Sequence, residues 1–158
     1  MPGQWDMVAR IAVAFGLTFV IGFEREVRGG PAGDRTYSLV GTAAAAIAAI
    51  AVAKGAGNAI AGIVTGVGFL GAALLFHSES GPIRGITSGA AVLAATAVGV
   101  VAGAGYPLVA TAATGLVLLT LELRYLPLLN YLDSRRYRGK VRGDDLPPTP
   151  RARRERRR

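Results

Sequence analysis

The chain has 158 residues, about half of them hydrophobic and only 18% of them charged. Soluble domains contain about 25% charged residues, so this composition argues against an ordinary water-soluble domain. The net charge of +8 is not spread evenly, because residues 1–123 contain six basic and six acidic residues, whereas residues 124–158 contain twelve basic and four acidic residues.

Long stretches without any ionised side chain organise the first 123 residues, at positions 11–23, 36–53, 55–76 and 86–121. A helix crosses the hydrocarbon with roughly 20 apolar residues, since each adds about 1.5 Å. The last stretch is too long for one span, and the Gly-Ala-Gly-Tyr-Pro sequence at 103–107 divides it. We therefore predict an all-α bundle of five transmembrane helices, at about 7–23, 37–53, 59–76, 85–102 and 107–123. The Ala-rich second span is the weakest of these, and a water-soluble Ala/Gly-rich bundle is the alternative.

Lys and Arg in short flanks predict the orientation, because cytoplasmic flanks are enriched in them. A cytoplasmic tail places the arginines of residues 24–36, Arg84 and all twelve tail charges inside, and leaves only Arg10 and Lys54 outside. We expect a multi-pass protein of the bacterial inner membrane with its N-terminus outside and its C-terminus in the cytoplasm. Residues 1–123 would form the membrane domain, residues 124–142 a basic juxtamembrane segment and residues 143–158 a disordered Arg-rich tail.

Glycines recur within these apolar spans. Residues 66–71 (Gly-Val-Gly-Phe-Leu-Gly) match the G-x-G-x-x-G dinucleotide fingerprint, which works only between a strand and a helix N-terminus. Here the match lies inside an apolar span, so we interpret it as close helix packing of the small-xxx-small type. The glycines expected to pack are Gly62, Gly66, Gly68, Gly71, Gly85, Gly89, Gly99 and Gly103, and leucine at Gly66 or Gly68 is expected to disrupt the bundle.

Residues 24–36 form the most polar segment of the membrane domain. Glu24 would lie at the C-terminal end of a helix, which is unfavourable for a carboxylate unless a cation neutralises it. Arg35 and Arg84 precede or open helices, where free N–H groups and hydroxyls suit an anion. We predict a cytoplasmic cluster in which Glu24 or Glu26 meets Arg35 or Arg84; a solvated loop with self-paired charges is the alternative. The candidate docking cluster comprises Glu24, Arg25, Glu26, Arg35, Thr36, Arg84 and Thr87.

Catalytic and metal-binding chemistry finds little support in the sequence. His77 and Glu79 are two potential ligands in a predicted loop, which is too few for a metal site. The absence of Cys excludes disulfides and thiolate metal sites. With one His, no nucleophile–base pair is apparent. We expect no catalytic residues, no metal, no cofactor and no enzymatic activity.

The segment after residue 123 mixes Arg with Tyr and Leu, as interfacial segments on anionic membranes do. The candidate lipid-facing residues are Arg135, Arg136, Arg138, Lys140 and Arg142. Each basic residue near the surface adds about 1 kcal/mol of attraction to anionic lipid. We favour lipid binding over a role as a topology signal alone, and nucleic-acid binding by the tail is not favoured.

The ordered polar and glycine-rich landmarks resemble the MgtC/SapB family of bacterial inner-membrane proteins. They are Gly-Phe-Glu-Arg-Glu at 22–26, Ala-Gly and Arg-Thr within 32–36, Leu-Val at 39–40, Gly-Val-Gly-Phe-Leu-Gly-Ala at 66–72 and Arg-Gly-Ile-Thr at 84–87. The chain departs from the family pattern at Asp34, Ala73 and Thr87-Ser88, and an Arg-rich tail stands where some members append a soluble regulatory domain.

The resemblance implies a five-helix membrane domain without established enzymatic activity. Family members are linked to acclimation to low magnesium and to survival in macrophages, and they regulate other membrane proteins, including the ATP synthase and phosphate uptake. We therefore expect a non-enzymatic regulator that binds another integral membrane protein or a second copy of itself within the bilayer. A small ion transporter or channel is the alternative, and a membrane-tethered nucleic-acid binder is a third class.

Overall fold

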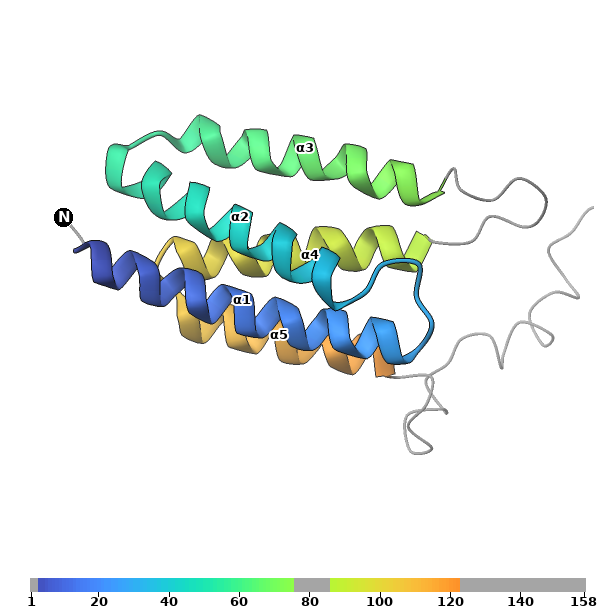
Figure 1. Cartoon of the computed structure of the whole chain (residues 1–158). Coiled ribbons are helices and arrows are strands. Elements are labelled where there is room, and N and C mark those ends of the chain that lie inside the picture. The colour runs from blue at the N-terminus through green and yellow to red at the C-terminus, as the bar shows by residue number, and fades with distance from the viewer. Residues whose placement is uncertain (1–2, 76–85, 123–158) are drawn as a thin grey trace, which may run out of the picture. The chain divides into compact units, whose positions relative to one another are not determined.

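The computed structural model describes residues 3–75 and 86–122, and these residues form helices and short turns without a strand. The helices are α1 (Gln4–Val27), α2 (Asp34–Lys54), α3 (Gly57–Leu75), α4 (Ile86–Gly103) and α5 (Pro107–Glu122) (Figure 1). The predicted all-α bundle of five helices is thus confirmed. The weakly supported second span is an uninterrupted helix of 21 residues.

Three of the helices, α1, α2 and α4, are long and apolar enough to cross a membrane, judged by length and composition. Two shorter apolar helices accompany them, at Gly57–Ala73 and Pro107–Glu122. Large apolar side chains point outward from the bundle, among them Phe15, Leu39, Phe69 and Leu108. A water-soluble bundle would bury most such side chains, whereas lipid tails are an apolar solvent for them. Their exposure therefore agrees with a membrane bundle.

Local chemistry accounts for where the helices begin and where the chain turns between them. Asp6 in the first turn of α1 pairs with Arg10 at 2.6 Å, and Asp34 in the first turn of α2 complements the positive end of that helix. Gly105 has a φ of +98° between α4 and α5. This backbone conformation favours glycine, and the Arg10 guanidinium lies against the position that a Cβ would take. Pro107 then opens α5, as expected for a residue whose φ already suits the first turn.

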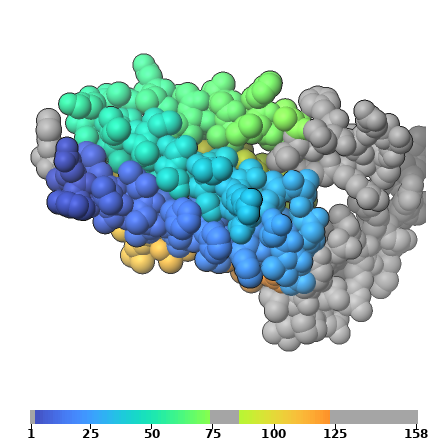
Figure 2. Space-filling view, in the orientation of Figure 1, coloured from blue at the N-terminus to red at the C-terminus, as the bar shows by residue number. Residues whose placement is uncertain are grey.

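The centre of the bundle is formed by α1, α2 and α4, each of which packs against the other two, while α3 packs on α2 and α4. Figure 2 shows α1, α2 and α3 side by side on one face of the molecule. The buried side chains are mostly small, such as Ala45, Ala48, Ala95 and Ala102. The α5 helix buries only Ala110 and Thr114. Small side chains in the core let the helix backbones approach closely.

Glycines make the closest of these contacts. A Cβ at Gly99 would clash with the backbone of Gly41, and a Cβ at Gly103 would clash with the Ala45 carbonyl, so α4 lies directly on α2. The approach of α3 to α4 is looser, since a Cβ at Gly89 would lie 3.2 Å from the Gly71 carbonyl oxygen. Packing by the four predicted glycines Gly71, Gly89, Gly99 and Gly103 agrees with the sequence interpretation.

Three predicted packing glycines behave differently. Nothing lies within 4 Å of a Cβ built at Gly62, Gly66 or Gly68, although Gly62 and Gly66 line an open hollow between α3 and α2. These glycines therefore do not pack within the described part of this chain, and the expectation that leucine at Gly66 or Gly68 disrupts the bundle is corrected. Contact with another protein's helix at these positions stays a prediction. Gly85 lies outside the described residues.

Candidate functional site

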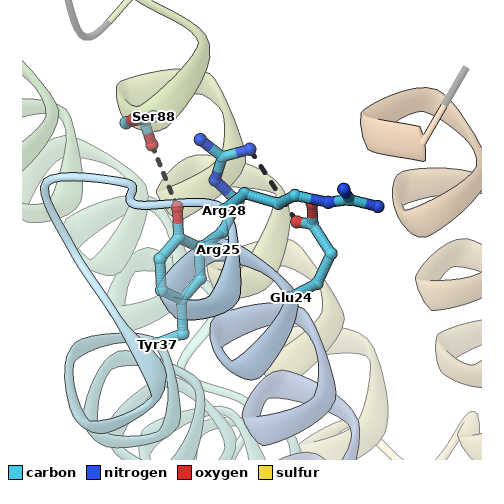
Figure 3. Close-up of polar contacts among 5 residues, drawn as sticks. All are labelled: Glu24, Arg25, Arg28, Tyr37 and Ser88. Carbon is cyan, nitrogen blue, oxygen red and sulfur yellow. Dashed lines mark hydrogen bonds and ion pairs between the residues drawn. The ribbon is translucent and has the colours of Figure 1, made fainter. Parts of the chain in front are cut away.

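The polar residues of the bundle gather where α1 ends and α2 begins. Five of them form what we call the helix-end network, drawn in Figure 3. Its members are Glu24, Arg25, Arg28, Tyr37 and Ser88. They come from three helices, because the first three belong to the last turn of α1 and its C-cap, Tyr37 belongs to the first turn of α2, and Ser88 belongs to the first turn of α4.

Glu24 is the anionic member of the helix-end network. Its side chain is only 10% exposed, and its carboxylate lies 3.8 Å from an Arg25 nitrogen and 3.9 Å from an Arg28 nitrogen. The Glu24–Arg28 pair has the i,i+4 spacing that brings two side chains to one helix face. A buried carboxylate at the negative end of a helix needs such cations, since both burial and the helix dipole disfavour its charge.

Tyr37 connects the network to a distant part of the chain. Its side chain is fully buried, and its hydroxyl donates to the Ser88 carbonyl oxygen at 3.4 Å, a long hydrogen bond across 51 residues. The Arg25 side chain is a second partner of this hydroxyl. Gly22 makes the approach of Tyr37 to α1 feasible, because a Cβ there would lie 2.9 Å from the Tyr37 Cβ. The network therefore ties α1, α2 and α4 together at one end of the bundle.

A polar pocket lies beside the network, lined by Glu26, Gly33, Asp34, Arg35 and Thr36 and about 490 Å³ in volume. The Glu26 carboxylate occupies the position that a Cβ of Gly33 would take, so glycine at position 33 allows Glu26 to lie against the start of α2. Arg35 and Thr36 are exposed. Among the residues that the structure describes, Arg35 has no carboxylate within salt-bridge distance.

The docking cluster expected from the sequence is thus only partly assembled as proposed. Glu26 and Arg35 share the polar pocket, but they form no ion pair within residues 3–75 and 86–122. The described cations beside Glu24 are Arg25 and Arg28 instead of Arg35, because Arg25 and Arg28 follow Glu24 on the same turn of α1. Arg84 lies outside the described residues, and Thr87 is exposed near the start of α4.

Sequence reasoning did not single out Arg28, Tyr37 and Ser88. The i,i+4 spacing of Glu24 and Arg28 was a usable signal. The sequence carries no signal for the hydrogen bond between Tyr37 and Ser88, since that contact depends on how α2 packs against α4. The tail residues expected to face lipid, from Arg135 to Arg142, lie outside the described residues, as do His77 and Glu79.

The described side chains of this site offer charge pairing and hydrogen bonding. The described residues contain no group of three or more His, Cys, Asp or Glu side chains that could hold a metal ion. Glu24 and Arg25 are largely shielded from solvent, whereas Arg28 of the network and Glu26, Arg35 and Thr36 beside it are accessible. The site therefore combines a largely buried ion pair with an exposed polar rim.

Comparison with known proteins places this arrangement in a family. The MgtC family model matches residues 11–126. The relatives include an uncharacterized protein of Haemophilus influenzae, 27% identical over 77% of this chain and 57% of its own length, and Protein MgtC of Brucella abortus, 40% identical over 61% of this chain and 42% of its own length. Protein SrpB of Synechococcus elongatus is 34% identical over 76% of both chains.

The chain spans about half the length of the first two of these relatives. No solved structure is significantly similar to it. The family match begins within α1 and ends beyond α5, so it covers α2, α3, α4 and α5 entirely. It includes the helix-end network and the polar pocket. This chain is a membrane protein of the MgtC/SapB type and belongs to the MgtC family.

Proposed function

We propose that this protein is a non-enzymatic regulator in the bacterial inner membrane, which acts by binding another integral membrane protein. Regulation by contact needs an accessible surface with a defined shape more than it needs reactive groups. The observation that supports the proposal best is the exposed rim of Glu26, Arg35 and Thr36 beside the helix-end network. Because the network ties three helices together, the rim is presented in one arrangement.

The bilayer-facing surface offers a second contact area for a partner. Gly62 and Gly66 of α3 line an open hollow beside α2 that no described atom fills within 4 Å of either glycine, and Phe69 on α3 is exposed. Helices that associate in membranes commonly approach through small residues. A partner's transmembrane helix, or α3 of a second copy, would lie against this face while its polar end meets the rim.

The orientation proposed from the charge distribution places the rim in the cytoplasm, together with the basic tail. The tail would hold the protein close to anionic lipid. A physiological link to magnesium or phosphate homeostasis rests on the likeness to relatives named MgtC and SapB and is part of the same proposal.

Affinity purification from mild detergent tests the regulator proposal. The tagged protein should recover a specific integral membrane protein, identified by mass spectrometry, and Arg35→Ala should lower this recovery several-fold. Lys54→Ala is the matched control, because Lys54 is also an exposed cation of α2 but lies at its opposite end. Equal recovery with Arg35→Ala and Lys54→Ala would overturn the docking assignment.

A flux assay distinguishes the alternative of an ion transporter or channel. Proteoliposomes containing the full chain should take up no more labelled magnesium or phosphate than protein-free vesicles. Saturable uptake that depends on the protein would replace the regulator proposal.

A further inference from the structure

An apolar groove of about 450 Å³ lies between α1 and α2, next to the polar pocket. Its walls are Phe15 and Phe19 on α1 and Leu39 and Thr42 on α2. The Phe15 and Phe19 rings have centroids 6.1 Å apart and form a continuous aromatic wall. Leu39 is 70% exposed and Phe15 is 50% exposed, so the groove is open on the outer surface of the bundle.

The groove and the polar pocket share two residues. Asp34 and Arg35 line both, at the start of α2, where the apolar walls give way to charged and hydroxyl groups. From Arg35 to Thr42 the helix rises about 10 Å, at 1.5 Å per residue. The two hollows therefore form one amphipathic site, with an apolar part of about 10 Å running into the membrane-spanning region and a polar part at its end.

The charges of the polar part indicate the kind of headgroup that fits. Arg35 is its cation, and Glu26 and Asp34 are its carboxylates. One oxygen of Asp34 accepts the Arg35 backbone N–H at 2.6 Å, which leaves its other lone pairs available. A simple anion would meet two carboxylates for one guanidinium. A zwitterion with a phosphate for Arg35 and an ammonium for Glu26 and Asp34 complements all three charges.

We propose that this site binds one phospholipid with a primary-ammonium headgroup, of the phosphatidylethanolamine class. Arg35 contacts the phosphate, Asp34 and Glu26 accept hydrogen bonds from the ammonium, and one acyl chain lies in the groove against Phe15, Phe19 and Leu39. The inference goes beyond the proposed function, since lipid binding needs no protein partner.

The other common headgroups fit less well. Phosphatidylglycerol has no ammonium and would place its net negative charge beside Glu26 and Asp34. Phosphatidylcholine has a cation, but its quaternary nitrogen has no N–H to donate to the carboxylates. Free phosphate would use Arg35 and leave the apolar groove uncovered.

Native mass spectrometry of the purified full chain tests the proposal. The protein is released from detergent in the presence of phosphatidylethanolamine, phosphatidylglycerol or phosphatidylcholine with identical acyl chains. One phosphatidylethanolamine molecule should be retained, with at least several-fold higher occupancy than either other lipid. Equal occupancy by all three would mean non-specific boundary lipid and would overturn the proposal, as would a preference for phosphatidylglycerol or displacement of the lipid by inorganic phosphate.

Variants separate the two parts of the site. Glu26→Gln combined with Asp34→Asn should abolish the headgroup preference while lipid retention continues. Arg35→Gln should lower retention of all three lipids, whereas Lys54→Gln should not. Leu39→Trp and Thr42→Trp, which fill the groove, should lower retention of phosphatidylethanolamine several-fold, and Leu108→Trp on exposed α5 is the matched control.

The lipid proposal and the regulator proposal can fail separately. Leu39→Trp keeps Arg35 and Glu26, so it should lose the lipid in the mass spectrometer yet leave their contacts with a partner available. Thermal unfolding in detergent checks that each variant is folded. Unchanged lipid retention in both folded groove variants would overturn the lipid site, whatever the result of partner purification.

Discussion

The glycines of α4 and the glycines of α3 differ in what they contact. Gly99 and Gly103 on α4 lie against the α2 backbone, where a Cβ would clash with Gly41 or Ala45. Gly62 and Gly66 on α3 have the same four-residue spacing, yet nothing lies within 4 Å of a Cβ at either. Equal spacing thus marks a buried helix contact in one region and an open face in the other.

The difference teaches that a small-xxx-small pattern identifies a helix face able to pack without identifying what packs on it. In the α2–α4 region the contact is made within the chain, so the glycines contribute to the stability of the bundle. In α3 the glycines border an open hollow beside α2, with Phe69 and Leu70 exposed near it, so lipid or another protein can reach them.

Substituting leucine at Gly99 should have the largest effect and tests the comparison directly. The added side chain would meet the Gly41 backbone, which cannot move without separating α2 from α4, so we expect a loss of about 3 kcal/mol or more, or no folded protein. Gly66→Leu is the matched control and should change the melting temperature little. Thermal unfolding of both variants in one detergent measures the contrast, and equal destabilisation by the two substitutions would refute it.

Glu24→Gln should have the next largest effect, and it tests the charged contacts of the packed region. Removing the carboxylate's charge leaves Arg25, which is largely buried, without its described anionic partner. We expect a loss of about 2 kcal/mol in unfolding free energy. Denaturant titration followed by circular dichroism measures it. Glu26→Gln, an exposed carboxylate on the same helix but outside the network, serves as a control, and a loss in Glu24→Gln no greater than in this control would contradict the role of the network.

Tyr37→Phe should have the smallest effect of the three. It keeps the buried ring but removes the hydroxyl that joins α2 to the Ser88 carbonyl of α4. The hydrogen bond is long at 3.4 Å, so its loss should cost about 1 kcal/mol or less. Thermal unfolding measures the change, and Tyr106→Phe, an exposed tyrosine before α5, is the control. Destabilisation as large as that of Gly99→Leu would mean that the hydroxyl, more than glycine packing, joins the two helices.

Much of the fold could be predicted from residues in the sequence. Charge-free stretches of sufficient length identified five helices, since an apolar helix is the structure that satisfies every backbone group in lipid. The turn at residues 103–107 followed from its Gly and Pro. The polar character of residues 24–36 identified the region of the candidate site, because charges are costly within the hydrocarbon and gather at helix ends.

The tertiary structure alone decided which helix faces meet. Tyr37 and Ser88 are 51 residues apart, and Phe15 with Leu39 forms one groove although they lie on different helices. Gly66 and Gly99 each belong to a pair of glycines four residues apart in an apolar helix, but only Gly99 lies against a neighbouring backbone. In an apolar chain almost every helix face tolerates burial, so hydrophobicity determines that the helices form and span, whereas steric fit between their backbones determines how they pack.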